Sequence, residues 1–223
     1  MFLDTSHIQF FDPGDETTIV ERRLPHWGQA GAISFITWRT HDSMPREVVK
    51  AWQEERMQWL LDHGMARADL GLQDPSQLLP MPLRREFKNR FRHRWQDRLD
   101  HCHGECELRD QKLATLVANS LRHFDEDRYL LTDFVIMPNH VHLLAAFPDE
   151  SSMLKQCESW KHYTAAQINR ELGRSGRFWQ QDGFDHLVRT EEQFRYLRGY
   201  VQENPSRAGL MIGEYDHYSR SVM

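Results

Sequence analysis

Hydrophobic and polar positions along the chain predict three strands and an extended segment. Residues 32–39, AISFITWR, are rich in β-branched and aromatic side chains, which is typical of a strand. Two further strands are predicted over 129–136 and 140–147, joined by the tight turn Met137-Pro138-Asn139. The segment 178–189 is predicted to be extended.

Helices are predicted where apolar residues recur at three- and four-residue spacing between capping signals. The last predicted helix begins at the capping-box sequence Thr190-Glu191-Glu192-Gln193 and is expected to end at Pro205. A basic helix is also expected around 84–98. The last helix thus covers 190–204. Three further helices are predicted over 45–62, 108–124 and 152–172.

This order of elements is compatible with an α+β fold, a ferredoxin-like split β-α-β-β-α-β antiparallel sheet with helices on one face. Residues 65–107 show no core pattern of their own and are predicted to be a helical insertion. The expected domain is 31–212, with an N-terminal extension over 1–30 and a C-terminal tail over 213–223.

Composition narrows the classes of protein. The 223 residues carry 28 Lys and Arg against 33 Asp and Glu, and this net charge of -5 argues against binding nucleic acid through bulk charge. No apolar run approaches the ~20 residues of a membrane span. The first ten residues lack the regions of a signal peptide, and three Cys are too few for a disulfide scaffold. We therefore expect a cytoplasmic protein without a membrane partner.

The charge is unevenly distributed. Residues 84–98 hold seven Lys and Arg against two acidic residues, with Phe87, Phe91 and Trp95 between them. Interleaved cations and aromatic rings suit a phosphate backbone with stackable bases, so Arg90 and Arg94 are candidate DNA contacts. The alternative is a solvated amphipathic helix that packs its aromatic side chains, and both interpretations can hold at once.

The hairpin VIMPNHVHLL holds the densest chemical signal. Alternate side chains of a strand share a face, so His140 and His142 should project together while Val141 points into the core. Two adjacent imidazoles form half of a divalent metal site, although hydrogen-bonded strand histidines are the alternative. The segment His101–Cys106 is a competing cluster that lacks a second half at zinc-finger spacing, so it is a structural zinc site or a plain loop.

A nucleophile next to such a metal would come from one of two tyrosines. Tyr200 and Asn204 are four residues apart and share a helix face, and Tyr163 and Gln167 have the same spacing. Tyr200 also lies on the apolar stripe of its helix, where it would be an ordinary core residue. Spacing does not choose between the two pairs.

Four motifs in order along 30–212 resemble a known family. They are MPNHVHLL, SWKHYTAAQIN (Ser159–Asn169), FWQQDGFDHLVR (Phe178–Arg189) and YVQENPSRAGL (Tyr200–Leu210). Together they resemble the single-tyrosine HUH transposases of small insertion sequences, and more closely the REP-associated tyrosine transposases. The resemblance implies the same split β-α-β-β-α-β fold.

The resemblance also implies a site and a cofactor. It maps the nucleophile to Tyr200 and leaves Tyr163 with Gln167 as the runner-up pair. The implied ligands of a divalent Mg2+ or Mn2+ ion are His140, His142 and Asn204. Lys161, Arg177 and Arg189 flank the motifs as candidate phosphate contacts, with Trp160 and Trp179 as stacking candidates. The alternatives are a core position for Trp179 and a surface ion pair for Arg189.

The implied activity is cleavage and rejoining of single-stranded DNA through a covalent 5′-phosphotyrosine, acting on hairpin-forming repeat DNA. The protein would then be nucleoid-associated, and a monomer or a homodimer. Two alternatives remain: a domesticated, non-catalytic protein that binds DNA hairpins, and a metal-dependent hydrolase that uses the histidine pair with water.

Overall fold

The computed structural model describes residues 8–12, 14–15, 18–21, 25–72, 74–181 and 183–221. The chain forms two compact units. Residues up to Ser43 and from Glu105 onward make one, here called the sheet unit, and residues Met44–Gly104 make the other, called the helical unit.

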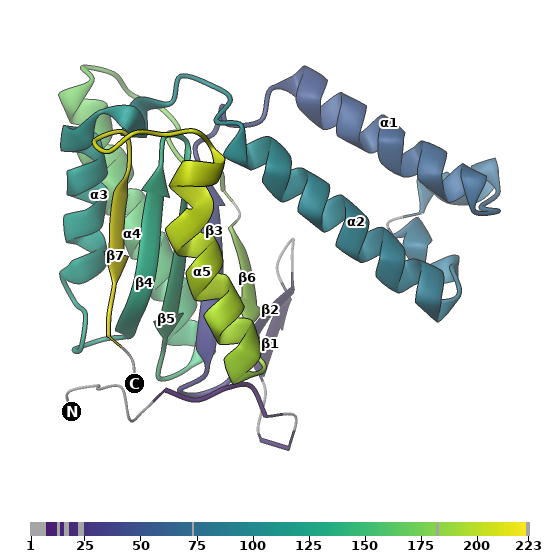
Figure 1. The fold of residues 1–223 in the computed structure, drawn as a ribbon, viewed down its shortest axis with the longest axis horizontal. Helices are drawn as coiled ribbons and strands as arrows, with labels where there is room; N and C mark the ends of the chain where they lie inside the picture. Colours follow the sequence, from purple (N-terminus) through teal and green to yellow (C-terminus); the bar gives the residue numbers. More distant parts are fainter. Residues whose placement is uncertain are drawn as a thin grey trace. The chain divides into compact units, whose positions relative to one another are not determined.

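The sheet unit is built on a five-stranded antiparallel sheet in the order β6-β3-β5-β4-β7 (Figure 1). The first four of these strands along the chain, with helices α3 (Gln111–Arg122) and α4 (Glu150–Glu171), form a split β-α-β-β-α-β motif. The predicted fold class is therefore confirmed. The strands are β3 (Ile33–Arg39), β4 (Leu130–Met137), β5 (His140–Ala146), β6 (Phe184–Leu187) and β7 (Asp216–Ser219).

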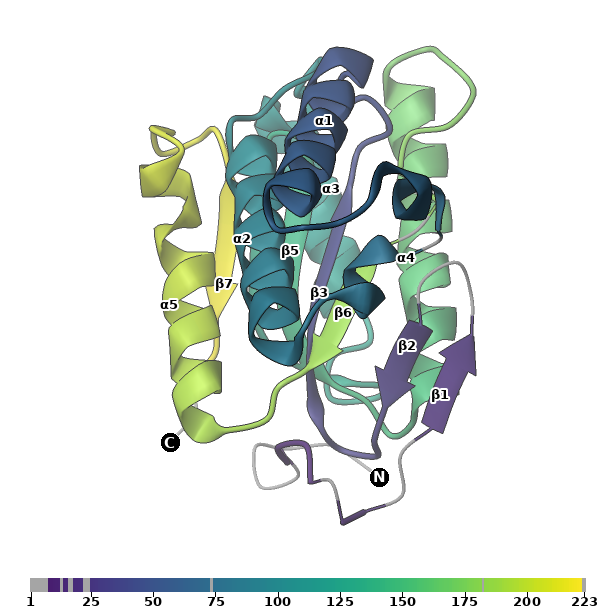
Figure 2. The same cartoon turned by 90° about the vertical axis from the view of Figure 1, so that its right-hand side faces the viewer.

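The two faces of this sheet are covered differently. Helices α3 and α4 pack on one face, and their apolar side chains share a core with Trp38, Val141 and Leu143 of the strands. Helix α5 (Glu191–Arg207), which follows the motif, lies on the opposite face (Figure 2). The prediction of helices on one face thus holds for the two helices of the motif, and α5 adds a second covered face.

Both predicted flanks of the domain contain short strands. The expected N-terminal extension holds β1 (Thr18–Glu21) and β2 (Pro25–Gly28), which pair as a separate two-stranded sheet. The expected C-terminal tail holds β7, which pairs with β4. Four-residue strands carry too little alternation to be recognised in a sequence.

The helical unit contains α1 (Arg46–Asp62) and α2 (Met81–Asp100), connected by short 3-10 turns. Because the unit begins at Met44, it includes α1, whereas the sequence places the insertion at 65–107. Its own core joins Trp59 and Leu60 to Phe87 and Phe91, which are 2% and 3% exposed. The aromatic side chains of the basic segment therefore pack inside the unit, as the amphipathic-helix alternative requires. No helix among the described residues is both long and apolar enough to cross a membrane.

The ends of α5 follow local chemistry. At its start, the backbone N–H of Gln193 donates to Thr190 Oγ1 over 3.1 Å. The expected end at Pro205 is wrong, because this proline lies inside the last turn and the helix continues to Arg207. Gly209, whose φ is +69°, then closes the helix in a Schellman motif: Leu210 N donates to the carbonyl of Pro205, and Gly209 N to that of Ser206.

We predict that Gly209→Ala lowers the free energy of unfolding by ~1 kcal/mol, because a Cβ is disfavoured at positive φ. No atom lies within 4 Å of the Cβ that alanine would add, so the cost is conformational. Gly199, within the same helix and equally open, is the matched control, and Gly199→Ala should stabilise the protein. Urea denaturation measures both; an unchanged Gly209→Ala variant would contradict the prediction.

Candidate functional site

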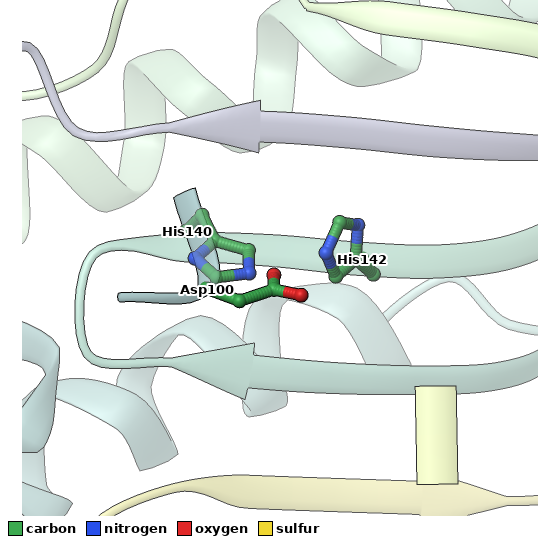
Figure 3. A group of neighbouring side chains, drawn as sticks. All are labelled: Asp100, His140 and His142. Carbon is green, nitrogen blue, oxygen red and sulfur yellow. The ribbon is translucent and has the colours of Figure 1, made fainter. Parts of the chain in front are cut away.

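The two histidines of the hairpin project from β5 onto the face of the sheet that α5 covers. Val141, between them, belongs to the core on the other face, as the alternation predicts. Both imidazoles are fully buried, and their ring centroids are 4.6 Å apart. Figure 3 shows the two rings side by side on β5; Asp100, also drawn there, comes from α2 of the helical unit.

Neighbouring polar groups hold each imidazole at its Nδ1 atom. His140 Nδ1 lies 2.7 Å from the Asn139 amide oxygen, and because this oxygen only accepts, Nδ1 carries the proton and Nε2 is the nitrogen that could bind a metal. His142 Nδ1 lies 2.7 Å from Thr37 Oγ1 on β3, the strand that pairs with β5. Sequence analysis missed Thr37, whose only signal is its place in the register of two strands.

Burial keeps both imidazoles neutral. It lowers the pKa of His142 to about 3, and it lowers the pKa of His140 well below its usual value, with a smaller contribution from His142. Neutral imidazoles bind metal without first losing a proton. Two imidazole nitrogens, with the amide oxygen of Asn204 that the resemblance implies as a third ligand, would suit Mn2+ and other divalent transition ions.

Helix α5 brings a tyrosine to this pair. The hydroxyl oxygen of Tyr200 lies 3.3 Å from His142 Nε2, and its ring packs edge-on against Phe35 of β3. Asn204, one helical turn further on, is fully buried. The structure therefore brings Tyr200 to the histidine pair, and Asn204 lies buried one turn further along the same helix.

The orientation of α5 depends on an ion pair that sequence analysis missed. Arg198 Nε donates to both carboxylate oxygens of Asp133 on β4, over 3.0 and 2.9 Å. Arg198 Nη2 donates to Ser219 Oγ of β7 and to the Arg220 carbonyl, and Ser219 Oγ donates to Asp133. The pair thus joins α5, β4 and β7. Its partners are 65 residues apart, so no local pattern reveals it.

The runner-up pair lies elsewhere. Tyr163 is 53% exposed on α4, the helix that covers the opposite face of the sheet from the histidines. Gln167 accepts a hydrogen bond from Arg170 Nη1 over 3.1 Å. The structure does not bring this pair to the imidazoles.

The candidate DNA contacts divide into exposed and engaged cations. Arg90, Arg177 and Arg189 are exposed. Arg94 donates to Glu55 over 2.5 Å, and Lys161 donates to the Gln181 carbonyl over 2.7 Å, so these two stabilise local structure.

The structure places both stacking candidates in the core, which corrects the expectation for Trp160 and agrees with the core alternative for Trp179. Trp160 and Trp179 are buried in the main core of the sheet unit. Their indole N–H groups donate to the Ser120 carbonyl and to Thr164 Oγ1. Satisfied indole donors let both rings pack inside, so neither ring is available to a base.

The cysteine cluster has no metal-site geometry. Within the described residues, no group of three closely spaced His, Cys, Asp or Glu ligand atoms includes Cys102 or Cys106. Both residues instead have positive φ, 51° and 54°, which is typical of a tight loop. The plain-loop alternative is therefore favoured.

The fold and the site share three features: a split antiparallel sheet, paired imidazoles on its middle strand, and a tyrosine that faces them from a later helix. Residues 100–204 match the family described as “Transposase IS200 like”, and this segment includes the histidine hairpin and most of α5. The resemblance to this family that the four motifs imply is thereby confirmed for residues 100–204.

No curated protein matches the chain. A solved structure described as a REP-associated tyrosine transposase bound to a REP hairpin is similar over 83% of this chain and 73% of its own, at 12% identity and a TM-score of 0.40. A likeness this weak supports no inference about the present chain.

We predict that Arg198→Ala lowers the free energy of unfolding by about 3–5 kcal/mol, because it leaves the Asp133 carboxylate, 1% exposed, without its cation. The matched control is Arg195→Ala on the same helix, since the Arg195–Glu191 pair is exposed and its loss should change the stability far less. Denaturant titrations compare the two. Losses of equal size would show that the buried pair does not anchor α5.

Proposed function

We propose that this protein cleaves and rejoins single-stranded DNA with the help of a divalent metal, through a covalent 5′-phosphotyrosine at Tyr200. The observation that carries the proposal is the 3.3 Å approach of the Tyr200 hydroxyl to His142 Nε2, with Asn204 on the following turn. The IS200-like transposase match over 100–204 supports DNA as the substrate.

The chemistry is a single in-line exchange of phosphodiester bonds. The phenol oxygen of Tyr200 gives up its proton and attacks the phosphorus, while the bond from phosphorus to the 3′ oxygen breaks and that oxygen takes up a proton. The phosphotyrosine keeps the energy of the phosphodiester, so a 3′-OH can reverse the step without a nucleotide cofactor. This distinguishes strand transfer from hydrolysis.

The residues that would hold the metal are His140, His142 and Asn204. When bound, an Mg2+ or Mn2+ ion would polarise a scissile-phosphate oxygen. Asn139 and Thr37 orient the two imidazoles through Nδ1, and the packing of Phe35 against Tyr200 limits the positions of the phenol. These contacts belong to the protein itself, so much of the site is arranged before DNA arrives.

The proposed substrate is a hairpin-forming single strand, because the four motifs resemble the REP-associated tyrosine transposases. Exposed Arg90, Arg177 and Arg189 are the proposed phosphate contacts. Association with the nucleoid follows from this substrate, and the assembly is a monomer or a homodimer.

We predict that Tyr200→Phe abolishes a covalent protein–DNA adduct, because it removes the attacking oxygen and keeps the ring. The measurement is denaturing gel electrophoresis after incubation with Mn2+ and end-labelled single strands that carry a hairpin. Tyr196→Phe is the matched control, since Tyr196 is on the same helix and 63% exposed, and it should react like the wild type.

The rival functions give different results in this assay. An adduct that survives in Tyr200→Phe but is lost in Tyr163→Phe would reverse the assignment of the nucleophile. Tight hairpin binding without any adduct would favour the non-catalytic DNA-binding protein. Cleavage that persists in both tyrosine variants would favour a hydrolase that uses water.

We predict that His142→Ala weakens Mn2+ binding by at least ~100-fold, and that Thr37→Val weakens it about 10-fold by freeing Nδ1 of His142. Isothermal titration calorimetry with Mn2+ measures this without any DNA. The control is His162→Ala, which removes an exposed imidazole from α4 and should leave the affinity unchanged. Equal affinity in His142→Ala and the wild type would place the metal elsewhere.

A further inference from the structure

The three arginines of α5 differ in what they contact. Arg195 and Arg198 are held by the carboxylates of Glu191 and Asp133. Arg207 forms no ion pair with any residue that the structure describes; its guanidinium carbon lies 5.6 Å from the centre of the Tyr200 ring. Arg207 is therefore a cation next to the candidate nucleophile, and no carboxylate in the described part of the chain pairs with it.

Its position on the helix is defined. Tyr200, Asn204 and Arg207 are spaced i, i+4 and i+7, so they form one stripe along α5. Arg207 is the last residue of α5. Its backbone is held within the Schellman motif, whose hydrogen bonds join Leu210 to Pro205 and Gly209 to Ser206. The side chain itself is exposed, unlike the buried Tyr200 and Asn204. It is thus accessible to a ligand from solvent while its base is held in place.

We propose that Arg207 is a further catalytic residue, which binds the non-bridging oxygens of the phosphate that Tyr200 attacks. This inference rests on the proposed function. As the Tyr200 oxygen bonds to phosphorus and the bond to the 3′ oxygen breaks, negative charge spreads over those oxygens. A planar guanidinium can donate two parallel hydrogen bonds to them, which the point charge of a lysine does not reproduce.

The competing explanation is structural. A cation in the last turn of a helix interacts favourably with the helix dipole, and a cation over a ring gains a cation–π contact. Both effects would stabilise α5 without any contact with DNA. An experiment must therefore detect the charge of the phosphate, and not only the loss of activity.

The test measures the single-turnover rate of adduct formation on a hairpin-carrying single strand with Mn2+. Arg207→Ala should lower this rate about 100-fold, the size of effect expected for one lost donor to a developing charge. Arg207→Lys should recover only part of it. Arg195→Ala is the matched control and should keep the wild-type rate. Unchanged thermal unfolding and Mn2+ binding in Arg207→Ala would show an intact fold.

The decisive comparison uses a neutral methylphosphonate at the scissile position, which removes one charged oxygen. On this substrate, Arg207→Ala and the wild type should react within a few-fold of each other, because the charge that Arg207 binds is gone. A deficit of the same size on both substrates would assign Arg207 a structural role and overturn the inference.

The adduct assay distinguishes the role of Arg207 from the proposed function. If the wild type forms an adduct and Arg207→Ala forms it equally fast, only the role of Arg207 is overturned. If the wild type forms no adduct on any hairpin, the proposed function falls, and the role of Arg207 falls with it.

Discussion

A carboxylate with almost no contact with water is stable in a protein only if a cation meets it, and Asp133 of β4 is such a carboxylate. Arg198 meets this requirement from α5, and the same guanidinium also holds Ser219 and the Arg220 carbonyl at β7. Tyr200 follows Arg198 by two residues, so the ion pair fixes the rotation of α5 about its axis. The distance between the phenol and the histidines thus depends on an interaction in which neither takes part.

The same alternation of side chains folds the sheet and builds the site. On β5, Val141 and Leu143 enter the core shared with α3 and α4, while His142, on the other face with His140, contacts Tyr200 of α5. A register slip of one residue would bury the imidazoles in that apolar core and expose the apolar side chains. The hydrophobic pattern therefore selects the face on which the imidazoles lie. Since β5 is hydrogen-bonded to β3 and β4 on its two sides, the histidines also occupy the most constrained strand position.

The parts that sequence analysis predicted are those encoded by neighbouring residues. The strands at 33–39, 130–137 and 140–146, and the shared face of His140 and His142, follow from alternation alone. Spacing does not choose Tyr200 over Tyr163, because each tyrosine has an amide side chain four residues further on. What separates the two is the face of the sheet that each helix covers. The core positions of Trp160 and Trp179 are hidden for the same reason, since the groups that accept from their indole N–H, on Ser120 and Thr164, are distant in sequence.

The last strand of the sheet limits how far this chain can be shortened from its C-terminal end. All four recognisable motifs lie before residue 213, and the family match ends at 204. Yet β7 lies beyond both limits and supplies Ser219 and the Arg220 carbonyl to the anchor of α5. A fragment cut at the last motif would contain every residue of the proposed reaction but would expose an edge of β4 and loosen the helix that carries the candidate nucleophile. The smallest functional piece of this chain is therefore set by its packing, and it is longer than its motifs.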